Sequence, residues 1–316
     1  MIKKPLMAGV ALLCCIAVFF VWYGIFVPRE KDSTTEVIFR IGKGEGGREI
    51  ANNLANQRLI RSAVLFQTYT VTKGMSRKLQ AGAYRVSPSM TVPEIANKFA
   101  SGDIIKDQIT IIEGWSVKDI ARHLEELGKF KAHEVIAKLG EREGYLFPDT
   151  YEVRQDMSVS ELGAKIWQNF EEKFTLELRQ ELLNQDKTIH EVITMASLVE
   201  KEVQTFEDKK MVSGILWKRL KNDIPLQVDA TISYITGGKT IQITAKEKEI
   251  DSPYNTYKYK GLPPSPIANP GMESILAAIY PKENFYWYYL STPDGQTIFS
   301  KNFEEHKAAK AKYLSY

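Results

Sequence analysis

Hydrophobic residues follow different patterns in successive parts of the chain. Residues 6–27 form an apolar run without a charged side chain, long enough to cross a hydrocarbon core of roughly 30 Å as a helix. The sequence Phe26-Val27-Pro28-Arg29 offers no small-residue cleavage site, so we expect a retained membrane anchor. Lys3 and Lys4 precede the run, and a short N-terminus of this kind ordinarily stays in the cytoplasm. The rest of the chain would then lie outside the membrane.

Short apolar stretches alternate with amphipathic ones in the next part of the chain. The predicted strands are 37–41, 82–86 and 108–112. Helices are expected to begin near Gly47, Val92 and Val117, where an acidic-Ile-Ala-x-x-apolar pattern is repeated. In each helix the Ile-Ala pair would face a core. We therefore expect an α/β region after the anchor.

Longer helical segments begin after the aromatic stretch that starts at Gly144. The predicted helices are 159–183, 188–203, 206–220 and 302–312, and a hairpin is predicted from strands 286–290 and 296–300. The expected fold class is α+β with three parts. They are residues 1–29 with the transmembrane helix, the α/β region 30–143, and a mainly helical domain with a small β-hairpin, 144–316.

The segment 188–203 carries a carboxylate on its apolar side. Thr188 and Glu191 form a capping-box pattern that starts the helix and sets its phase. Glu200 then falls beside the apolar stripe, whereas Glu202 lies further out on the other flank. The stripe is Val192, Ala196, Val199 and Val203, and the polar residues Thr194, Ser197 and Lys201 are expected opposite. A carboxyl group held against aliphatic carbons loses hydration of its charged form and can act as a general acid. Alternatively, Glu200 is a rim residue whose carboxylate reaches water or a basic side chain.

Further candidate residues follow in two segments. Asp229 is a second carboxylate, although capping of a short helix explains it as well. The proline-containing stretch 252–271 carries Tyr254, Asn255 and Asn269. Aromatic faces and amide groups on rigid loops suit sugars, and a stiff surface connection is the alternative.

Charge, cysteine and histidine content exclude several functions. The net charge is +3, of which Lys3 and Lys4 supply two, so there is no electrostatic case for nucleic acid. Both cysteines lie inside the apolar run, which leaves no disulfide for the exterior domain. The four histidines are too scattered for a metal site, so no metal is expected.

A glycine-rich stretch at residues 42–47 formally matches the dinucleotide-binding pattern. We interpret it as a turn that starts a helix, because no run of alternating parallel strands and helices follows. No cofactor is expected.

Eight ordered motifs resemble one family. They are Leu79-Gln-Ala-Gly-Ala-Tyr84, Gly144-Tyr-Leu-Phe-Pro-Asp-Thr-Tyr151, Ala196-Ser-Leu-Val-Glu-Lys-Glu202, Leu226-Gln-Val-Asp-Ala-Thr231, Ser252-Pro-Tyr-Asn-Thr-Tyr257, Gly261-Leu-Pro-Pro264, Ile267-Ala-Asn-Pro-Gly271 and Phe299-Ser-Lys301. The chain resembles the YceG-like endolytic murein transglycosylases, bacterial enzymes that cut peptidoglycan glycan strands. The resemblance covers nearly the whole chain. Small departures are Val228, Ala230 and Ser265, which put fine site geometry in doubt.

The resemblance implies an architecture and partners. It implies a LysM-like subdomain at about 37–86, a catalytic domain from 144, and a single-pass protein of the cytoplasmic membrane with its C-terminal domain in the periplasm. Its partners would be peptidoglycan strands and penicillin-binding proteins of cell-wall synthesis complexes.

The resemblance also implies the chemistry. Glu200 would be the catalytic residue, with Gln227, Asp229, Tyr254, Asn255 and Asn269 as the candidates for orienting the sugar. As a single acid, Glu200 would protonate the leaving oxygen at C1 of N-acetylmuramic acid and then accept the proton of that sugar's own C6 hydroxyl as a 1,6-anhydro ring closes. Glu200→Gln should therefore be nearly inactive and Glu202→Gln milder.

Two other functions stay open at the level of the sequence. A noncatalytic glycan-binding scaffold would not need Glu200 on the apolar face. A hydrolase would need Asp229 or another carboxylate opposite Glu200.

Overall fold

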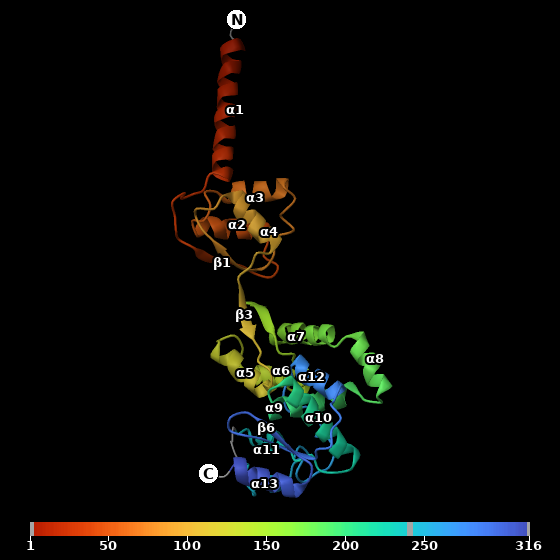
Figure 1. Ribbon diagram of the computed structural model, residues 1–316. Helices are drawn as coiled ribbons and strands as arrows, with labels where there is room; N and C mark the ends of the chain where they lie inside the picture. Colours follow the sequence, from red (N-terminus) through yellow and green to blue (C-terminus); the bar gives the residue numbers. More distant parts are fainter. Residues whose placement is uncertain (1–2, 239–242, 315–316) are drawn as a thin grey trace. The chain divides into compact units, whose positions relative to one another are not determined.

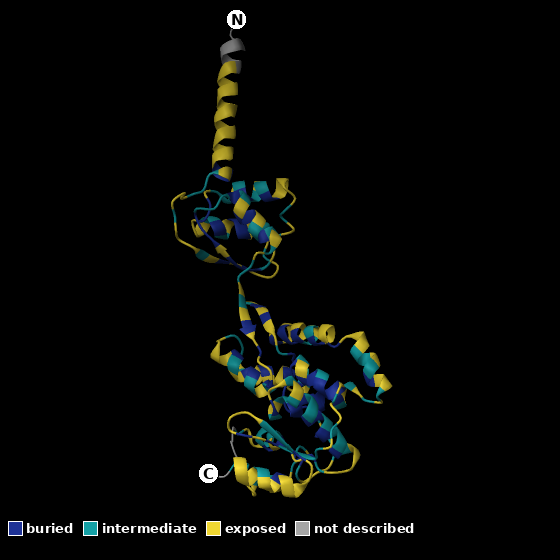
Figure 2. Cartoon of the chain, viewed as in Figure 1, coloured by how far each residue is buried: buried dark blue, intermediate teal, exposed yellow. Residues whose placement is uncertain are grey.

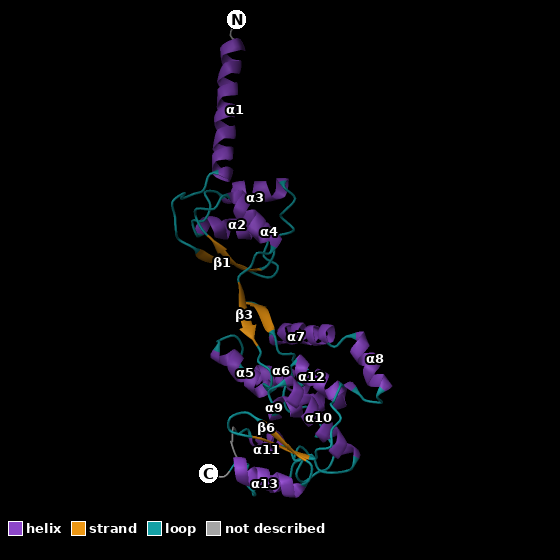
Figure 3. Ribbon diagram, viewed as in Figure 1, coloured by secondary structure: helices purple, strands orange, loops and turns teal. Residues whose placement is uncertain are grey.

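The computed structural model describes residues 3–238 and 243–314 (Figure 1). Within these residues there are thirteen α-helices, two short 3-10 turns and three two-stranded sheets (Figure 3). The coarse prediction of a helical protein with small sheets is therefore confirmed. The chain divides into two compact units, residues 3–107 with 152–157 and residues 108–151 with 158–314. We describe each unit by itself.

The first helix, α1 (Lys3–Phe26), matches the predicted anchor in extent. Its segment Ala8–Phe26 is the one stretch, among the described residues, that is long and apolar enough to cross a membrane. Side chains are exposed from Ala8 to Tyr23 and become buried at Gly24 and Ile25 (Figure 2). The helix is thus compatible with a single-pass anchor whose last turn packs against protein.

The remainder of the first unit is built around a strand pair. Its elements are β1 (Val37–Ile41), α2 (Gly47–Asn56), α3 (Ala63–Thr72), β2 (Gly82–Val86) and α4 (Val92–Ser101). Strands β1 and β2 pair antiparallel, with Phe39 opposite Tyr84. These rings pack with Phe66 and Phe99 in a fully buried core. Both strands begin and end as predicted, whereas α3 was not expected from the sequence.

The two units are linked through β3 (Lys106–Thr110) and β4 (Thr150–Arg154), which pair with each other. The second unit then contains α5 (Val117–Glu126), α6 (Ala132–Leu139), α7 (Val159–Lys173), α8 (Leu176–Asn184), α9 (Ile189–Glu202), α10 (Phe206–Lys221), α11 (Asp229–Thr236), α12 (Met272–Ile279), β5 (Tyr288–Ser291), β6 (Thr297–Ser300) and α13 (Phe303–Tyr313). By packing, residues 108–143 belong to this unit. That the catalytic domain begins at residue 144 stays a prediction.

The predicted helix 159–183 is in fact two helices. The break falls at Phe174, whose ring is 1% exposed and stacks on Phe170. Its freed carbonyl oxygen accepts a hydrogen bond from Arg179 Nε at 3.1 Å. The chain can turn here because the Phe174 ring is buried and the Phe174 carbonyl oxygen has a partner in Arg179 in place of a helical N–H group.

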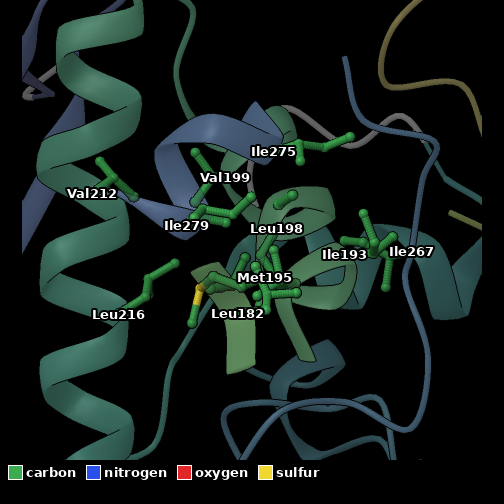
Figure 4. Close-up of a cluster of buried hydrophobic side chains, with 14 of the residues drawn as sticks. Leu182, Ile193, Met195, Leu198, Val199, Val212, Leu216, Ile267, Ile275 and Ile279 are labelled. Carbon is green, nitrogen blue, oxygen red and sulfur yellow. The ribbon is translucent and has the colours of Figure 1, made fainter. Parts of the chain in front are cut away.

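Helix α9 lies at the centre of the second unit. Thr188 and Glu191 form the predicted capping box, and α9 begins at Ile189. Every residue from Val192 to Val199 is buried, because α10 and α12 both pack on this helix. Figure 4 shows the shared core of Met195, Leu198, Val199, Val212, Leu216, Ile275 and Ile279. The expected polar face is therefore wrong, since Thr194 and Ser197 are fully buried.

Candidate active site

Glu200 lies near the C-terminal end of α9 in a nearly closed polar environment. One carboxylate oxygen accepts hydrogen bonds from Ser274 Oγ at 2.6 Å and from the Gly271 amide at 3.0 Å. The other oxygen lies 3.4 Å from Lys209 Nζ, and the two side chains are 8% and 4% exposed. Hydrogen bonds between a carboxylate and a cation are among the strong ones, so these contacts fix the position of the Glu200 side chain. The expectation that Glu200 rests against aliphatic carbons is wrong, because these partners surround its head group.

A second acidic side chain beside Glu200 was not expected from the sequence. Glu113 follows β3, and burial together with the charge of Glu200 raises its pKa. Its carboxylate lies so close to Gly271 that a Cβ at this glycine would overlap it. Lys209 also lies 3.9 Å from Glu273. Glu113 directly precedes Gly114, a glycine with positive φ that lies against Glu200 and Lys201 of α9. An acidic residue just before such a turn is the sequence feature that could have identified Glu113.

Glu202 occupies the opposite flank of α9, since residues two apart on a helix point roughly 200° apart. It lies on this flank as predicted and is partly buried. Its carboxylate accepts hydrogen bonds from Tyr289 Oη at 3.0 Å and from the Ala230 amide. Burial raises the pKa of Glu202 to about 7, and the negative charge of Asp229 adds to the rise. A carboxyl group with this pKa can hold a proton at neutral pH and release it.

Two predicted residues lie on the Glu202 flank. Asp229, the first residue of α11, is exposed and accepts a hydrogen bond from Tyr257 Oη. Gln227 is exposed and has a φ of +54°, a left-handed conformation that residues other than glycine rarely adopt. The backbone amide of Gln227 donates a hydrogen bond to Thr256 O at 3.0 Å. This bond holds the turn on the 252–257 loop. Backbone strain of this kind occurs often at ligand sites.

The other three predicted residues hold loops together. The Asn255 side chain, fully buried, donates to Lys248 O and Ile250 O at 2.9 and 2.8 Å. Asn269 accepts hydrogen bonds from the Gly144 and Leu146 amides and donates to Glu143 at 3.1 Å. Its amide groups are therefore satisfied by protein.

Glu143 and Tyr254 belong to one network with Asn269. Glu143 accepts from the Val117 amide at 3.0 Å and from Tyr234, whose ring packs on Tyr254. Burial raises the pKa of Glu143 to about 7. The Tyr254 hydroxyl is 2.6 Å from Ser265 Oγ. This network connects residues 144–146 and residues 254–269 with the start of α5 at Val117.

The predicted residues thus fall into separate groups. Glu202, Asp229 and Gln227 lie on one flank of α9, and Glu200 is enclosed on the other. The described surface cavities, of about 690 and 440 Å³, are lined by first-unit residues such as Lys98 and Arg40, so they do not involve α9. Within residues 3–238 and 243–314, no three His, Cys, Asp or Glu side chains are grouped to hold a metal ion. That no metal takes part stays a prediction.

The structure is that of a mainly helical protein with small sheets, in which two carboxyl groups, Glu200 and Glu202, lie on opposite flanks near the end of the buried helix α9. The YceG-like family model matches residues 39–312, so the chain belongs to the YceG-like family. It is 35% identical to an endolytic murein transglycosylase of Bacillus subtilis (strain 168), over 91% of this chain and 88% of that protein. It is 27% identical to the endolytic murein transglycosylase of Streptococcus pneumoniae (strain ATCC BAA-255 / R6), over 92% of this chain and 60% of that protein.

A solved structure agrees with this relationship. The crystal structure of a yceG-like protein from Listeria monocytogenes matches with a TM-score of 0.60 and 31% sequence identity. The match covers 88% of this chain and 100% of that chain.

Proposed function

We propose that this chain is an endolytic murein transglycosylase, a lyase that cleaves the bond between N-acetylmuramic acid and N-acetylglucosamine within peptidoglycan strands and so ends their elongation. Its relatives of this name and its membership of the YceG-like family support the activity. The observation that carries the mechanism is the position of Glu202, whose partly buried carboxyl group accepts a hydrogen bond from Tyr289 near the exposed Asp229. Burial raises the pKa of Glu202 to about 7.

We infer that Glu202 is a proton donor of the reaction. Glu202 can be protonated at neutral pH, and its neighbours Gln227 and Asp229 are exposed to an incoming strand. Glu200 accepts hydrogen bonds from Ser274 Oγ and the Gly271 amide, and Lys209 Nζ lies 3.4 Å from its other oxygen. These contacts hold the 271–274 segment on α9, and catalysis by Glu200 stays a prediction from the sequence.

The chemistry then needs one carboxyl group. Glu202 gives its proton to the glycosidic oxygen as the bond from C1 of N-acetylmuramic acid to that oxygen breaks. The C6 hydroxyl oxygen of the same sugar forms a new bond to C1, and its proton passes to the Glu202 carboxylate. The acid is thereby restored, and no water is consumed. An intramolecular nucleophile supplies by proximity what a second carboxylate supplies in hydrolases.

Gln227 and Asp229 are the residues we propose to orient the sugar. Tyr257 holds Asp229 from the protein side, which leaves the other carboxylate oxygen for a sugar hydroxyl. Tyr254, Asn255 and Asn269, the other three candidates, would act through the shape of the loops, because protein groups already occupy their polar atoms.

The first unit is proposed to be LysM-like over about 37–86. The order β1, α2, α3, β2 with the two strands paired antiparallel supports this interpretation. We further propose a single-pass protein of the bacterial cytoplasmic membrane, with the C-terminal domain in the periplasm. Penicillin-binding proteins of the synthesis complexes would be its partners there.

Mass analysis of digested peptidoglycan tests the activity. Products should carry 1,6-anhydro-N-acetylmuramic acid ends, one water lighter than hydrolytic ends, and should contain no oxygen from labelled water. Reducing ends that carry the labelled oxygen would make the protein a hydrolase with Asp229 as the second carboxylate. Unchanged strands would support a binding scaffold.

A further inference from the structure

Helix α3 has no charged face. From Ser62 to Thr72 the chain contains no charged residue, although Arg61 and Lys73 flank it on either side. Its polar residues are Gln67, Thr68, Thr70 and Thr72, which do not form the strongly polar face of a typical surface helix. Here one stripe is left open, since Val64 is 69% and Val71 58% exposed.

The opposite side of α3 is buried in the first unit. Phe66 and Thr70 belong to its interior and are 0% and 1% exposed. Leu65 and Tyr69 on a third stripe of the same helix, together with Arg61 just before it, face the end of α1. The exposed stripe of Val64, Thr68 and Val71 borders that third stripe around the helix.

Close contacts fix α1 to α3. The Arg61 guanidinium lies 4.8 Å from the centre of the Tyr23 ring, and Phe26 meets Tyr69 edge-on at 6.4 Å. Gly24 allows the approach, because a Cβ there would overlap the end of the Leu65 side chain.

Two hydrogen bonds close the junction. Arg61 donates to Pro28 O at 2.6 Å, and Arg29 donates to Ile60 O at 3.0 Å. The end of the span is therefore held directly on α3 and is not separated from it by a free linker.

We propose that α3 is an interfacial helix that seats the first unit on the lipid bilayer through Val64, Thr68 and Val71. This inference rests on the proposed anchor. The last turn of α1 contains Trp22 and Tyr23, the residue types that mark the membrane–water boundary. An adjoining apolar stripe at that level enters the boundary between headgroups and acyl chains. Arg61 and Lys73 at the two ends complement anionic headgroups.

Spin-label accessibility in nanodiscs of phosphatidylethanolamine and phosphatidylglycerol tests the inference. The full chain carries Cys14→Ala and Cys15→Ala, and one nitroxide is attached at Val64→Cys or Val71→Cys. Ile38→Cys, 53% exposed on β1 of the same unit, is the matched control. Ile16→Cys within α1 reports the anchor.

The ratio of accessibility to oxygen over accessibility to a water-soluble nickel complex should be severalfold higher at 64 and 71 than at 38, and should approach the ratio at 16. If 16 is in lipid while 64 and 71 match 38, the inference is overturned and the anchor stands. If 16 is in water, the anchor fails and the inference with it. Dipolar broadening between labels at 64, removed by diluting with unlabelled protein, would show a second copy on this stripe and also overturn the inference.

Discussion

Individual carboxyl groups on α9 differ in what surrounds them, and this difference decides their expected roles. The Glu200 carboxyl group lies beside the buried Lys209 and accepts two hydrogen bonds, from Ser274 and the Gly271 amide. Glu202 has a phenol and one amide, and its burial leaves the neutral form populated near neutral pH. The resemblance assigns catalysis to Glu200, the first glutamate of the motif 196–202, whereas the surroundings of the two carboxyl groups favour Glu202 as a proton donor.

Paired substitutions on α9 should separate catalysis from folding. Glu202→Gln should lower activity on the order of 10² to 10⁴-fold while the protein melts normally, because a general acid is lost and no buried charge is left unpaired. Glu200→Gln should destabilise by on the order of 3 kcal/mol, because Lys209, 3% exposed, loses its partner.

Glu273→Gln is the matched control, since this second partner of Lys209 is 59% exposed and lies 3.9 Å away. It should change stability by less than about 1 kcal/mol. Activity assays and melting curves on the same preparations decide the matter. Full activity in Glu202→Gln, together with a well-folded but inactive Glu200→Gln, would return the assignment to Glu200.

Wild-type activity should also depend on the protonation of Glu202. Its raised pKa of about 7 means that the acid form is lost as the pH rises through 7, so the rate should fall there. Rates measured from pH 5 to 9 with a defined glycan substrate check this. A rate that stays constant through pH 7 and falls only above pH 8 would contradict a proton donor of this pKa.

Glu143 should make stability depend on pH in a defined sense. Burial raises its pKa from 4.5 to about 7, so the folded state binds its proton more tightly than the unfolded state does. The contribution of Glu143 to the free energy of unfolding is fully present below pH 4.5 and is lost as the pH rises through about 7. The loss is on the order of 3 kcal/mol.

Glu143→Gln should flatten this part of the stability profile, whereas the exposed Glu141→Gln should keep the wild-type slope. Urea unfolding followed by tryptophan fluorescence suits the measurement, because Trp115, Trp167, Trp217 and Trp287 all lie in the second unit. Identical slopes for all three proteins would show that Glu143 does not carry the effect.

At the level of whole elements, the sequence predicted those features that depend on local chemistry. The capping box at Thr188, the strands 37–41 and 82–86, and the C-terminal hairpin are confirmed within a few residues. Helix α3 was missed because it lacks the charged face that makes a period visible. The full burial of α9 was missed because α10 and α12, which cover it, are set by tertiary packing.

The candidate site was predicted less completely for the same reason. Helical phase places Glu200 and Glu202 on different flanks, but it does not say which distant segment meets each flank. Gly271 and Ser274 contact Glu200, and Tyr289 contacts Glu202. Each of these partners lies 70 or more positions away in the chain. Contacts of that range follow from the fold and not from local pattern.

Substitution by alanine should destabilise the protein more at one helix glycine than at another. On α10, a Cβ at Gly214 would overlap the Lys282 carbonyl oxygen, which is main chain and is fixed by the Lys282 amide bond to Lys210 O at 3.0 Å. Gly214→Ala should therefore cost about 1–3 kcal/mol despite the better helix propensity of alanine.

On α7, a Cβ at Gly163 would meet only the end of the Leu139 side chain, which can rotate away. Gly163→Ala should stay within about 1 kcal/mol of wild type. Urea unfolding of both variants checks the pair. Equal destabilisation would mean that main-chain contact at Gly214 is not what limits this position.

For the whole molecule, the uncharged run 6–27 and the position of Lys3 and Lys4 before it predict one membrane crossing, with the chain after Pro28 outside. Protease added to intact spheroplasts should then degrade the chain after Pro28 and leave a fragment about the size of α1 in the membrane. A cytoplasmic marker protein should stay intact in the same sample, which shows that the membrane was closed. If the C-terminal unit survives until the membrane is opened, the orientation is reversed. A chain with that orientation would have no access to peptidoglycan, so the proposed activity would fail with it.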